Sequence, residues 1–74
     1  MNKEKLVGKK VVLKNVYYFN MINGIIEERY EDIEGILEKV GKNNFFGWDI
    51  SATIDGQAYK LDTLSQIRPI YKVR

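Results

Sequence analysis

The acidic side chains of this 74-residue chain gather in one segment. Residues 27–38 carry six carboxylates against the single basic residue Arg29, which gives a formal charge of −5. Paired carboxylates can act as general acid and base, and carboxylate oxygens can bind Ca²⁺ or Mg²⁺. The spacing does not follow the Asp-x-Asp-x-Asp-Gly order of a calcium loop, and solvated carboxylates keep ordinary pKa values. We therefore expect a solvated acidic face with no catalytic residue and no metal site.

Two residue types that carry much of protein chemistry are missing from the sequence, which holds no histidine and no cysteine. Zinc sites and histidine acid–base catalysis need one or both of them, and no disulfide can form. The glycines Gly35, Gly41 and Gly47 are six residues apart, which is not the spacing of a phosphate-binding loop. We predict a protein that is not an enzyme and needs no cofactor.

Basic residues lie at both ends of the chain. Residues 1–14 have a formal charge of +4 and residues 60–74 of +3. Lysines neutralise phosphates and aromatic rings stack on bases, so such residues on a barrel surface would bind RNA. A mixed, solvated surface is the simpler interpretation of the same charges. The candidate nucleic-acid contacts are Lys10, Lys14, Lys60 and Arg68 at phosphates, with Tyr18 and Tyr59 at bases.

Exposed aromatic residues would instead indicate a surface that binds protein. The acidic segment carries Tyr30 and Ile33, which could meet a basic partner. Phe46 and Trp48 are expected in the core, whereas Phe45 points the other way in the alternation and is either covered or exposed. An exposed Phe45 would be a natural contact residue. The predicted partner-binding residues are Tyr18, Tyr30, Ile33 and Phe45.

The first part of the chain predicts a strand followed by an ambiguous insert. The length allows one domain over residues 1–74. Residues 9–19 are rich in β-branched and aromatic side chains and predict a strand. Strict alternation would put Val11, Leu13 and Tyr17 on one face and Val16 on the other.

The insert between residues 24 and 34 allows two interpretations. Apolar residues from Ile26 to Val40 are spaced 4, 3, 4 and 3, which is a helical period. That period favours a short helix near residues 25–34, ended by Gly35 in a left-handed conformation. The turn signal Asn23-Gly24 supports the alternative, a long hairpin. We favour the helix, with a strand from Ile36 to Val40 after it.

The second half of the chain reads as short strands. Residues 46–54 alternate with period two, and Asp55-Gly56 is a hairpin turn before the returning strand at residues 57–61. Residues 63–66 predict a 3₁₀ turn, and residues 67–73 a last strand with its proline at an edge. The fold class is therefore mostly β: a small five-stranded barrel with a short helical or loop insert between the first two strands.

Several segments resemble known small barrels. Asp32 to Val40, followed by Phe45 to Ile50, resembles the second and third strands of Sm-like barrels. Tyr59-Lys60 through Ile67-Arg68-Pro69 is similar to the end of the bacterial Hfq-type Sm domain, and residues 22–25 resemble the turn after that family's first strand. Eukaryotic SH3-like barrels share the strand order. Hfq-type proteins carry a histidine after the Tyr-Lys pair, where this chain has Leu61, and fold alone does not imply RNA binding or ring formation.

Size, composition and lack of chemistry together favour binding as the function. We expect a small accessory or inhibitor protein of phage or bacterial mobile-element origin, which binds a larger protein stoichiometrically. A Sm-like RNA-binding protein and an oligomer that sequesters a small molecule or nucleotide are the alternatives, and a homo-oligomer is possible. No apolar run is long enough for a membrane span and no secretion signal is evident, so we expect a cytoplasmic protein without membrane contact.

Overall fold

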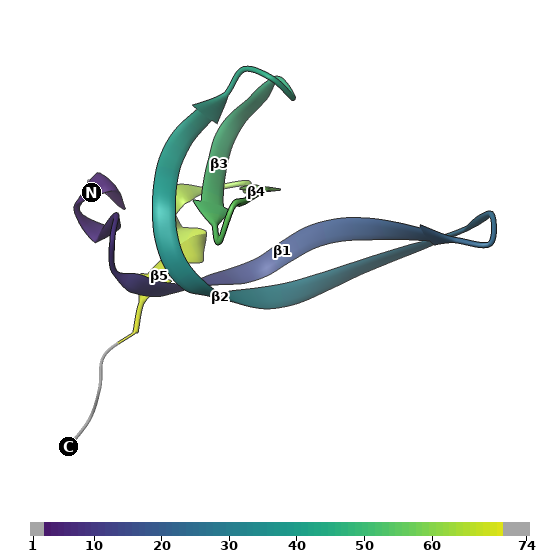
Figure 1. Cartoon of the computed structure of the whole chain (residues 1–74), viewed down its shortest axis with the longest axis horizontal. Helices are drawn as coiled ribbons and strands as arrows, with labels where there is room; N and C mark the ends of the chain where they lie inside the picture. Colours follow the sequence, from purple (N-terminus) through teal and green to yellow (C-terminus); the bar gives the residue numbers. More distant parts are fainter. Residues whose placement is uncertain (1–2, 71–74) are drawn as a thin grey trace.

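The computed structural model describes residues 3–70. Five strands and two short 3₁₀ turns follow one another along the chain (Figure 1). In order they are η1 (Lys3–Leu6), β1 (Lys10–Ile22), β2 (Ile25–Asn43), β3 (Trp48–Ile54), β4 (Gln57–Lys60), η2 (Leu64–Gln66) and β5 (Ile67–Pro69). The mostly-β class, the 3₁₀ turn before the last strand and the hairpin at Asp55-Gly56 are as predicted, while residues 71–73 of the predicted last strand lie outside the described residues.

The strands form one open sheet in the order β4-β3-β2-β1-β5, and all of its neighbours are antiparallel. The five strands of the predicted barrel form an open sheet and not a closed barrel, because β4 and β5 end the sheet without a ladder between them in the described part of the chain. These two strands have only four and three residues, and Pro69 in β5 has no amide to donate. The turn η2 spans the gap instead (Figure 1).

The insert is a hairpin, so the predicted helix near residues 25–34 was wrong. Strand β2 runs without interruption through the insert and pairs with β1 from Ile22↔Ile25 to Lys10↔Ile36. The two-residue turn Asn23-Gly24, with φ values of 52° and 78°, has the positive dihedrals that a tight hairpin requires. Residues spaced at a helical period therefore lie on different faces of a strand, and cross-strand pairing overrides the weak helical signal.

Gly35 has a different role from the predicted helix cap. Its backbone is not left-handed, and it lies inside β2 opposite Val11. A Cβ placed there would overlap the Cγ2 methyl of Ile54 and lie 2.9 Å from Oδ2 of Asp55. The glycine therefore allows a close approach between β2 and the end of β3, next to the point where β2 leaves β1 and begins to pair with β3.

A β-bulge in β1 changes which side chains enter the core. The register between β1 and β2 shifts between Leu13 and Val16, and Asn15 has a φ of 53°. Val16 is therefore fully buried, whereas Tyr17 is exposed, so the predicted assignment of these two residues to faces was wrong. One extra residue in a strand reverses the alternation beyond it. The core consists of Val11, Leu13, Val16, Leu37, Ala52, Ile54, Leu61 and Ile67.

The β2–β3 connection holds its aromatic residues outside the core. Strand β3 begins at Trp48, and Phe45 and Phe46 before it are 88% and 54% exposed, so the prediction of a buried Phe46 was wrong. Phe46 stacks on Trp48 with ring centroids 4.5 Å apart, and Phe45 meets the edge of Phe46 at 4.8 Å. Because the turn places these rings beyond the end of the small core, they pack against one another instead.

Beyond the bulge, β1 and β2 leave the rest of the sheet as a two-stranded ribbon, which we call the arm (residues 16–31; Figure 1). The pairing of β1 with β5 ends at Leu13, and that of β2 with β3 begins at Leu37. Seven residues of each strand give the arm a length of about 24 Å. The radius of gyration of 13.1 Å exceeds the about 11 Å expected for a compact chain of this length.

In residues 3–70 we find no helix with the length and apolar character to cross a membrane.

Candidate functional site

The arm carries an exposed apolar surface on one of its two faces. Cross-strand pairing places Tyr17 opposite Tyr30, Phe19 opposite Glu28 and Met21 opposite Ile26. All six side chains lie on the same face because residues two apart in a strand share a face. The five apolar ones, which we call the arm face, are 41–67% exposed. The arm face comprises Tyr17, Phe19, Met21, Ile26 and Tyr30.

The single charge among these residues is held by a neighbour. The Tyr17 hydroxyl donates a hydrogen bond of 2.8 Å to Glu28, and the Tyr17 and Tyr30 rings meet at 5.5 Å. The pKa of Tyr17 is raised from 10.0, first because its hydroxyl donates to the Glu28 carboxylate. The hydrogen bond holds the carboxylate beside the Tyr17 ring, so the face carries five apolar side chains and this one charge.

The opposite face of the arm is more polar and turns partly toward the sheet. Near its base, Tyr18 is half-buried. Its hydroxyl donates to Glu31 at 2.7 Å, and the Arg29 guanidinium lies 5.2 Å from its ring centroid. The pKa of Tyr18 is raised, first by the hydrogen bond to Glu31 and then by desolvation, while Arg29 opposes the rise. Near the tip, Ile22 and Ile25 lie opposite each other on this second face.

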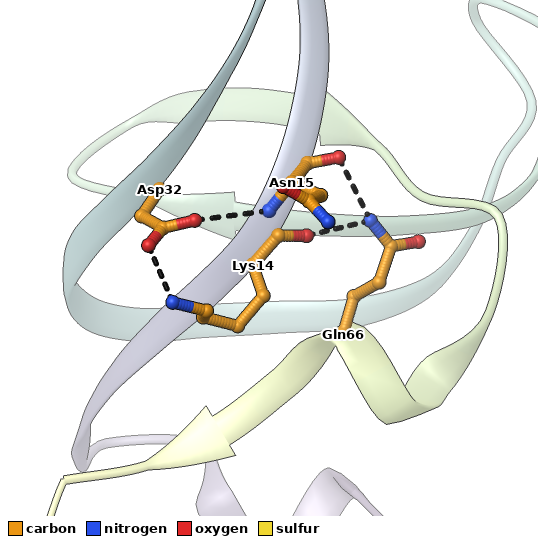
Figure 2. Close-up of polar contacts among 4 residues, drawn as sticks. All are labelled: Lys14, Asn15, Asp32 and Gln66. Atoms are coloured by element: carbon orange, nitrogen blue, oxygen red, sulfur yellow. Dashed lines mark hydrogen bonds and ion pairs between the residues drawn. The ribbon is translucent and has the colours of Figure 1, made fainter.

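The bulge that starts the arm is fixed from two sides (Figure 2). The Asp32 carboxylate of β2 accepts hydrogen bonds from Lys14 Nζ at 2.5 Å and from the Asn15 backbone amide at 3.1 Å. Gln66 of η2 donates through Nε2 to the carbonyls of Lys14 and Asn15 at 2.8 and 3.2 Å. The Lys14 and Asn15 hydrogen bonds lower the pKa of Asp32 below its ordinary value of 3.8. The direction of the arm is therefore set by one side chain from β2 and one from η2.

A groove of about 560 Å³ lies between the base of the arm and β4. Curvature brings β4 toward β1, although the two strands stand three places apart in the sheet. The side chains that could recognise a ligand are the rings of Tyr18, Trp48 and Tyr59 and the ammonium group of Lys60. The full lining is Tyr17, Tyr18, Phe19, Asn20, Trp48, Gln57, Ala58, Tyr59 and Lys60.

A second, more polar cavity of about 600 Å³ lies beside the bulge. Its lining includes Lys14 and Arg68, which the sequence predicted as phosphate contacts, and Tyr30 of the arm face. Lys14 is already paired with Asp32. Asp62 also lines the cavity, so its charge is mixed. This composition fits a hydrated recess around the bulge better than an anion site.

The structure divides the predicted nucleic-acid residues between several places. Tyr18, Tyr59 and Lys60 line the groove together, whereas Lys14 and Arg68 line the bulge cavity. Lys10 forms an ion pair of 3.4 Å with Glu34 across the β1–β2 ladder. The basic first strand therefore meets the acidic segment of β2, which neutralises part of the charge that suggested a phosphate surface.

The predicted partner-binding residues are also separated. Tyr30 is in the arm face, and Tyr18 lies on the opposite face of the arm. Ile33 packs against the core, which leaves it little surface for a partner. Phe45 is exposed, as one of the two sequence interpretations had it, but it lies outside the lining of the groove that contains Tyr18.

Sequence reasoning missed four of the five arm-face residues, which are Tyr17, Phe19, Met21 and Ile26. The signal was present in the sequence. Asn23-Gly24 fixes the register of a hairpin, and with that register Phe19 and Met21 share a face with Ile26. The helical interpretation of the insert hid this pattern.

Within residues 3–70, no three acidic side chains come close enough together to hold a metal ion. Comparison of the chain with protein-family models, curated proteins and solved structures found no match. The Sm-like and SH3-like resemblance therefore stays a prediction that rests on the residues quoted for it.

Proposed function

We propose that the chain is a non-enzymatic binding module that binds a larger protein stoichiometrically, and that the arm face makes the contact. The observation that carries the proposal is the exposure of all five apolar side chains of the arm face on a ribbon that projects from the sheet. Contiguous apolar surface on a small protein marks a site of interaction. Its content of three aromatic residues and one methionine is typical of interface centres.

Energetics support the same conclusion. An isolated two-stranded ribbon is marginally stable in water, because one ladder does not compensate for the entropy of ordering it. The arm has no packed layer on either face near its tip, where Met21, Ile22, Ile25 and Ile26 are all more than half exposed. A partner that covers the arm face would bury Met21 and Ile26 and would order the ribbon at the same time.

The charges around the arm face indicate the chemistry of the partner. Carboxylates at Glu27, Glu28 and Glu31 accompany it along β2, with Arg29 as the only cation among residues 16–31. A complementary surface would be apolar at its centre and basic at its rim. Rim charges of this kind speed association and set orientation more than they add affinity.

The test compares two pairs of substitutions that differ only in the face they change. Met21→Ser with Ile26→Ser removes a cross-strand pair from the arm face, while Ile22→Ser with Ile25→Ser removes the adjacent pair from the opposite face. Both pairs are similarly exposed, so both variants should fold. Loss of burial for two such side chains is worth about 2–3 kcal/mol, or roughly 30–150-fold in affinity.

The measurement is quantitative affinity capture of the full chain from cells that produce it, followed by titration of the recovered partner. We expect the wild type and the Ile22/Ile25 variant to retain a one-to-one partner that the Met21/Ile26 variant loses. Equal retention by all three proteins would contradict the assignment of the arm face. Turnover of any substrate by the purified chain would contradict the proposal of a non-enzymatic module.

Binding of single-stranded nucleic acid is a second candidate function, and the groove is the observation that favours it. It gathers Tyr18, Tyr59 and Lys60 from distant parts of the sequence and adds Trp48. Aromatic rings beside a cation suit stacked bases and a phosphate. The carboxylate of Glu31, which accepts a hydrogen bond from Tyr18, and the pairing of other lysines weigh against it.

Salt and one matched pair of variants test this candidate. Nucleic-acid binding should weaken steeply between 50 and 200 mM salt. Lys60→Gln should weaken the binding of a labelled oligonucleotide, while Lys39→Gln, an exposed lysine outside the groove, should not. Equal effects of the two substitutions would indicate non-specific attraction and remove the groove from consideration.

A further inference from the structure

The two edges of the arm differ in how they are protected. Within residues 3–70, the outer edge of β1 beyond the bulge, residues 16–22, has no strand hydrogen-bonded to it, because β5 pairs only with Val11, Val12 and Leu13. Strand β4 lies across the groove from residues 17–20 without forming a ladder with them. The outer edge of β2 in the arm is also unpaired, because pairing with β3 begins at Leu37. Each edge therefore presents backbone amide and carbonyl groups without strand partners.

Charge distinguishes these edges. Strand β2 carries Glu27, Glu28, Glu31, Asp32 and Glu34 along its free stretch. Residues 15–22 of β1, Asn-Val-Tyr-Tyr-Phe-Asn-Met-Ile, contain no charge, no proline and no glycine. Charged side chains are a common device that keeps an edge strand from pairing with another chain. Only the β1 edge lacks such a device, and its residues have high β-propensity.

From this asymmetry we infer that the arm pairs with a second copy of this chain through the β1 edge. The two β1 strands run antiparallel about a two-fold axis and join the two arms into one four-stranded ribbon, β2-β1-β1-β2. The uncharged strands meet at the centre, and the acidic β2 strands lie at the outside, as far apart as the ribbon allows. Pairing through the β2 edges would instead place like charges beside one another.

The register follows from the ends of the free edge. The bulge at Asn15 closes it at one end and the turn at Asn23-Gly24 at the other, so the pairing segment is residues 16–22 with Phe19 at its centre. Full-length antiparallel pairing places Phe19 opposite Phe19 of the second copy and Tyr17 opposite Met21. Because paired residues share a face, the apolar sides of both arms become continuous.

The hydrogen-bonding groups are directed correctly for this register. In a hairpin with a two-residue turn, the flanking pair Ile22–Ile25 is hydrogen-bonded and the pairs then alternate. The backbone groups of Tyr17, Phe19 and Met21 therefore point away from β2, toward the free edge. In the proposed register these three residues face each other across the axis, and about six inter-chain hydrogen bonds can form.

The size of the contact suits a reversible dimer. Interfaces carry about one hydrogen bond per 100–200 Å², so about six bonds correspond to roughly 600–1,200 Å², at the lower limit of specific interfaces. The two globular parts would lie toward opposite ends of the joined ribbon, about one arm length apart, and the second strand would run along the groove between residues 17–20 of β1 and β4. Each turn would end level with the bulge of the other copy.

The test uses the absence of cysteine, since an introduced thiol has no other thiol in the same chain with which to form a disulfide. Phe19→Cys places a thiol at the proposed axis, where the Cα atoms would be about 5.5 Å apart, a distance that a disulfide can span. Glu28→Cys is the matched control, because Glu28 lies directly opposite Phe19 on the same face but on β2. Both variants are oxidised mildly and examined by non-reducing electrophoresis, with sedimentation of the wild type across a range of concentrations.

We expect a concentration-dependent dimer of the wild type and at least tenfold more disulfide dimer from Phe19→Cys than from Glu28→Cys. Mixing Tyr17→Cys with Met21→Cys should give a mixed disulfide in preference to either homodimer, which tests the register with a second set of side chains. A wild type that stays monomeric at about 100 μM, or equal cross-linking at the two positions, would overturn the proposal. Preferred cross-linking of Glu28→Cys would overturn it in favour of the β2 edge.

Discussion

Replacing Gly35 by alanine should destabilise the fold through a clash in the core. The new Cβ would overlap Cγ2 of Ile54 and press on the Asp55 carboxylate, which can rotate away, whereas the buried Ile54 cannot. Overpacking of this kind costs about 1–3 kcal/mol. For a domain of this size that corresponds to a fall in melting temperature of roughly 5–20 °C. Thermal unfolding followed by circular dichroism measures it directly.

The double variant with Ile54→Leu separates the clash from other causes. Leucine keeps the volume of the side chain but lacks the branched methyl that the Cβ at position 35 would meet, and such a swap costs less than about 1.5 kcal/mol. In the Ile54→Leu background, Gly35→Ala should therefore cost less than in the wild type. A fall of under 2 °C for Gly35→Ala alone, or full additivity of the two changes, would refute the close approach.

Three further predictions concern the polar contacts. Gln66→Ala removes the hydrogen bonds that hold η2 to the bulge and those that Oε1 accepts from the amides of Asp62 and Thr63. It should lower the free energy of unfolding by about 1–3 kcal/mol, measured by urea titration, and a change under about 0.5 kcal/mol would contradict the anchoring role of Gln66. The pKa of Asp32 is lowered in the fold by its hydrogen bond from Lys14, so its contribution to stability is present above its ordinary pKa of 3.8 and is lost as pH falls through the lower folded value. Asp32→Asn should flatten that acid limb of a stability–pH curve, and an unchanged limb would show that other carboxylates cause it. The pKa of Tyr18 is raised above 10.0 by donation to Glu31, so its contribution to stability is present below about pH 10 and is lost as pH rises through the folded value. The spectrophotometric titration curve of Tyr18→Phe should lack one late-titrating phenol. The same curve in both proteins would contradict the assignment.

Local signals in the second half of the chain predicted its structure well. The strand over residues 50–54 and the Asp55-Gly56 turn need only neighbouring residues to form, and the structure has both, although Ser51 is buried beside Ala52. Pro69 lies in the edge strand β5, as its missing amide requires. Where the sequence interpretation failed, the cause was an interaction between distant segments.

The bulge and the insert show that limit. No sequence pattern around Asn15 predicts a left-handed residue there, because the bulge is held by Asp32 and Gln66, which lie 17 and 51 residues further along the chain. One such residue reversed every assignment beyond it in β1. In the insert, no packed core selects between a helical and an extended period, so only the turn at residues 23–24 could have decided.

In the candidate sites, too, local patterns predicted some features, while others depended on contacts between distant segments. Tyr18, Tyr59 and Lys60 could be singled out as residue types, and the curvature of the sheet brings all three to one groove. Their grouping depends on the approach of β4 to β1, which no local pattern encodes. The arm face, in contrast, follows from the hairpin register alone once the turn is accepted.

The arm also has a length that can change independently of the rest of the chain. Within residues 3–70, its two strands pair with no third strand beyond the bulge, so insertions near the turn leave the core and the other ladders unaltered. Adding two residues to each strand would lengthen it by about 7 Å and keep every side chain on its face, whereas adding one would exchange the faces. Natural or engineered variants could therefore change the length of the arm in steps of two residues per strand, while the rest of the fold stays unaltered.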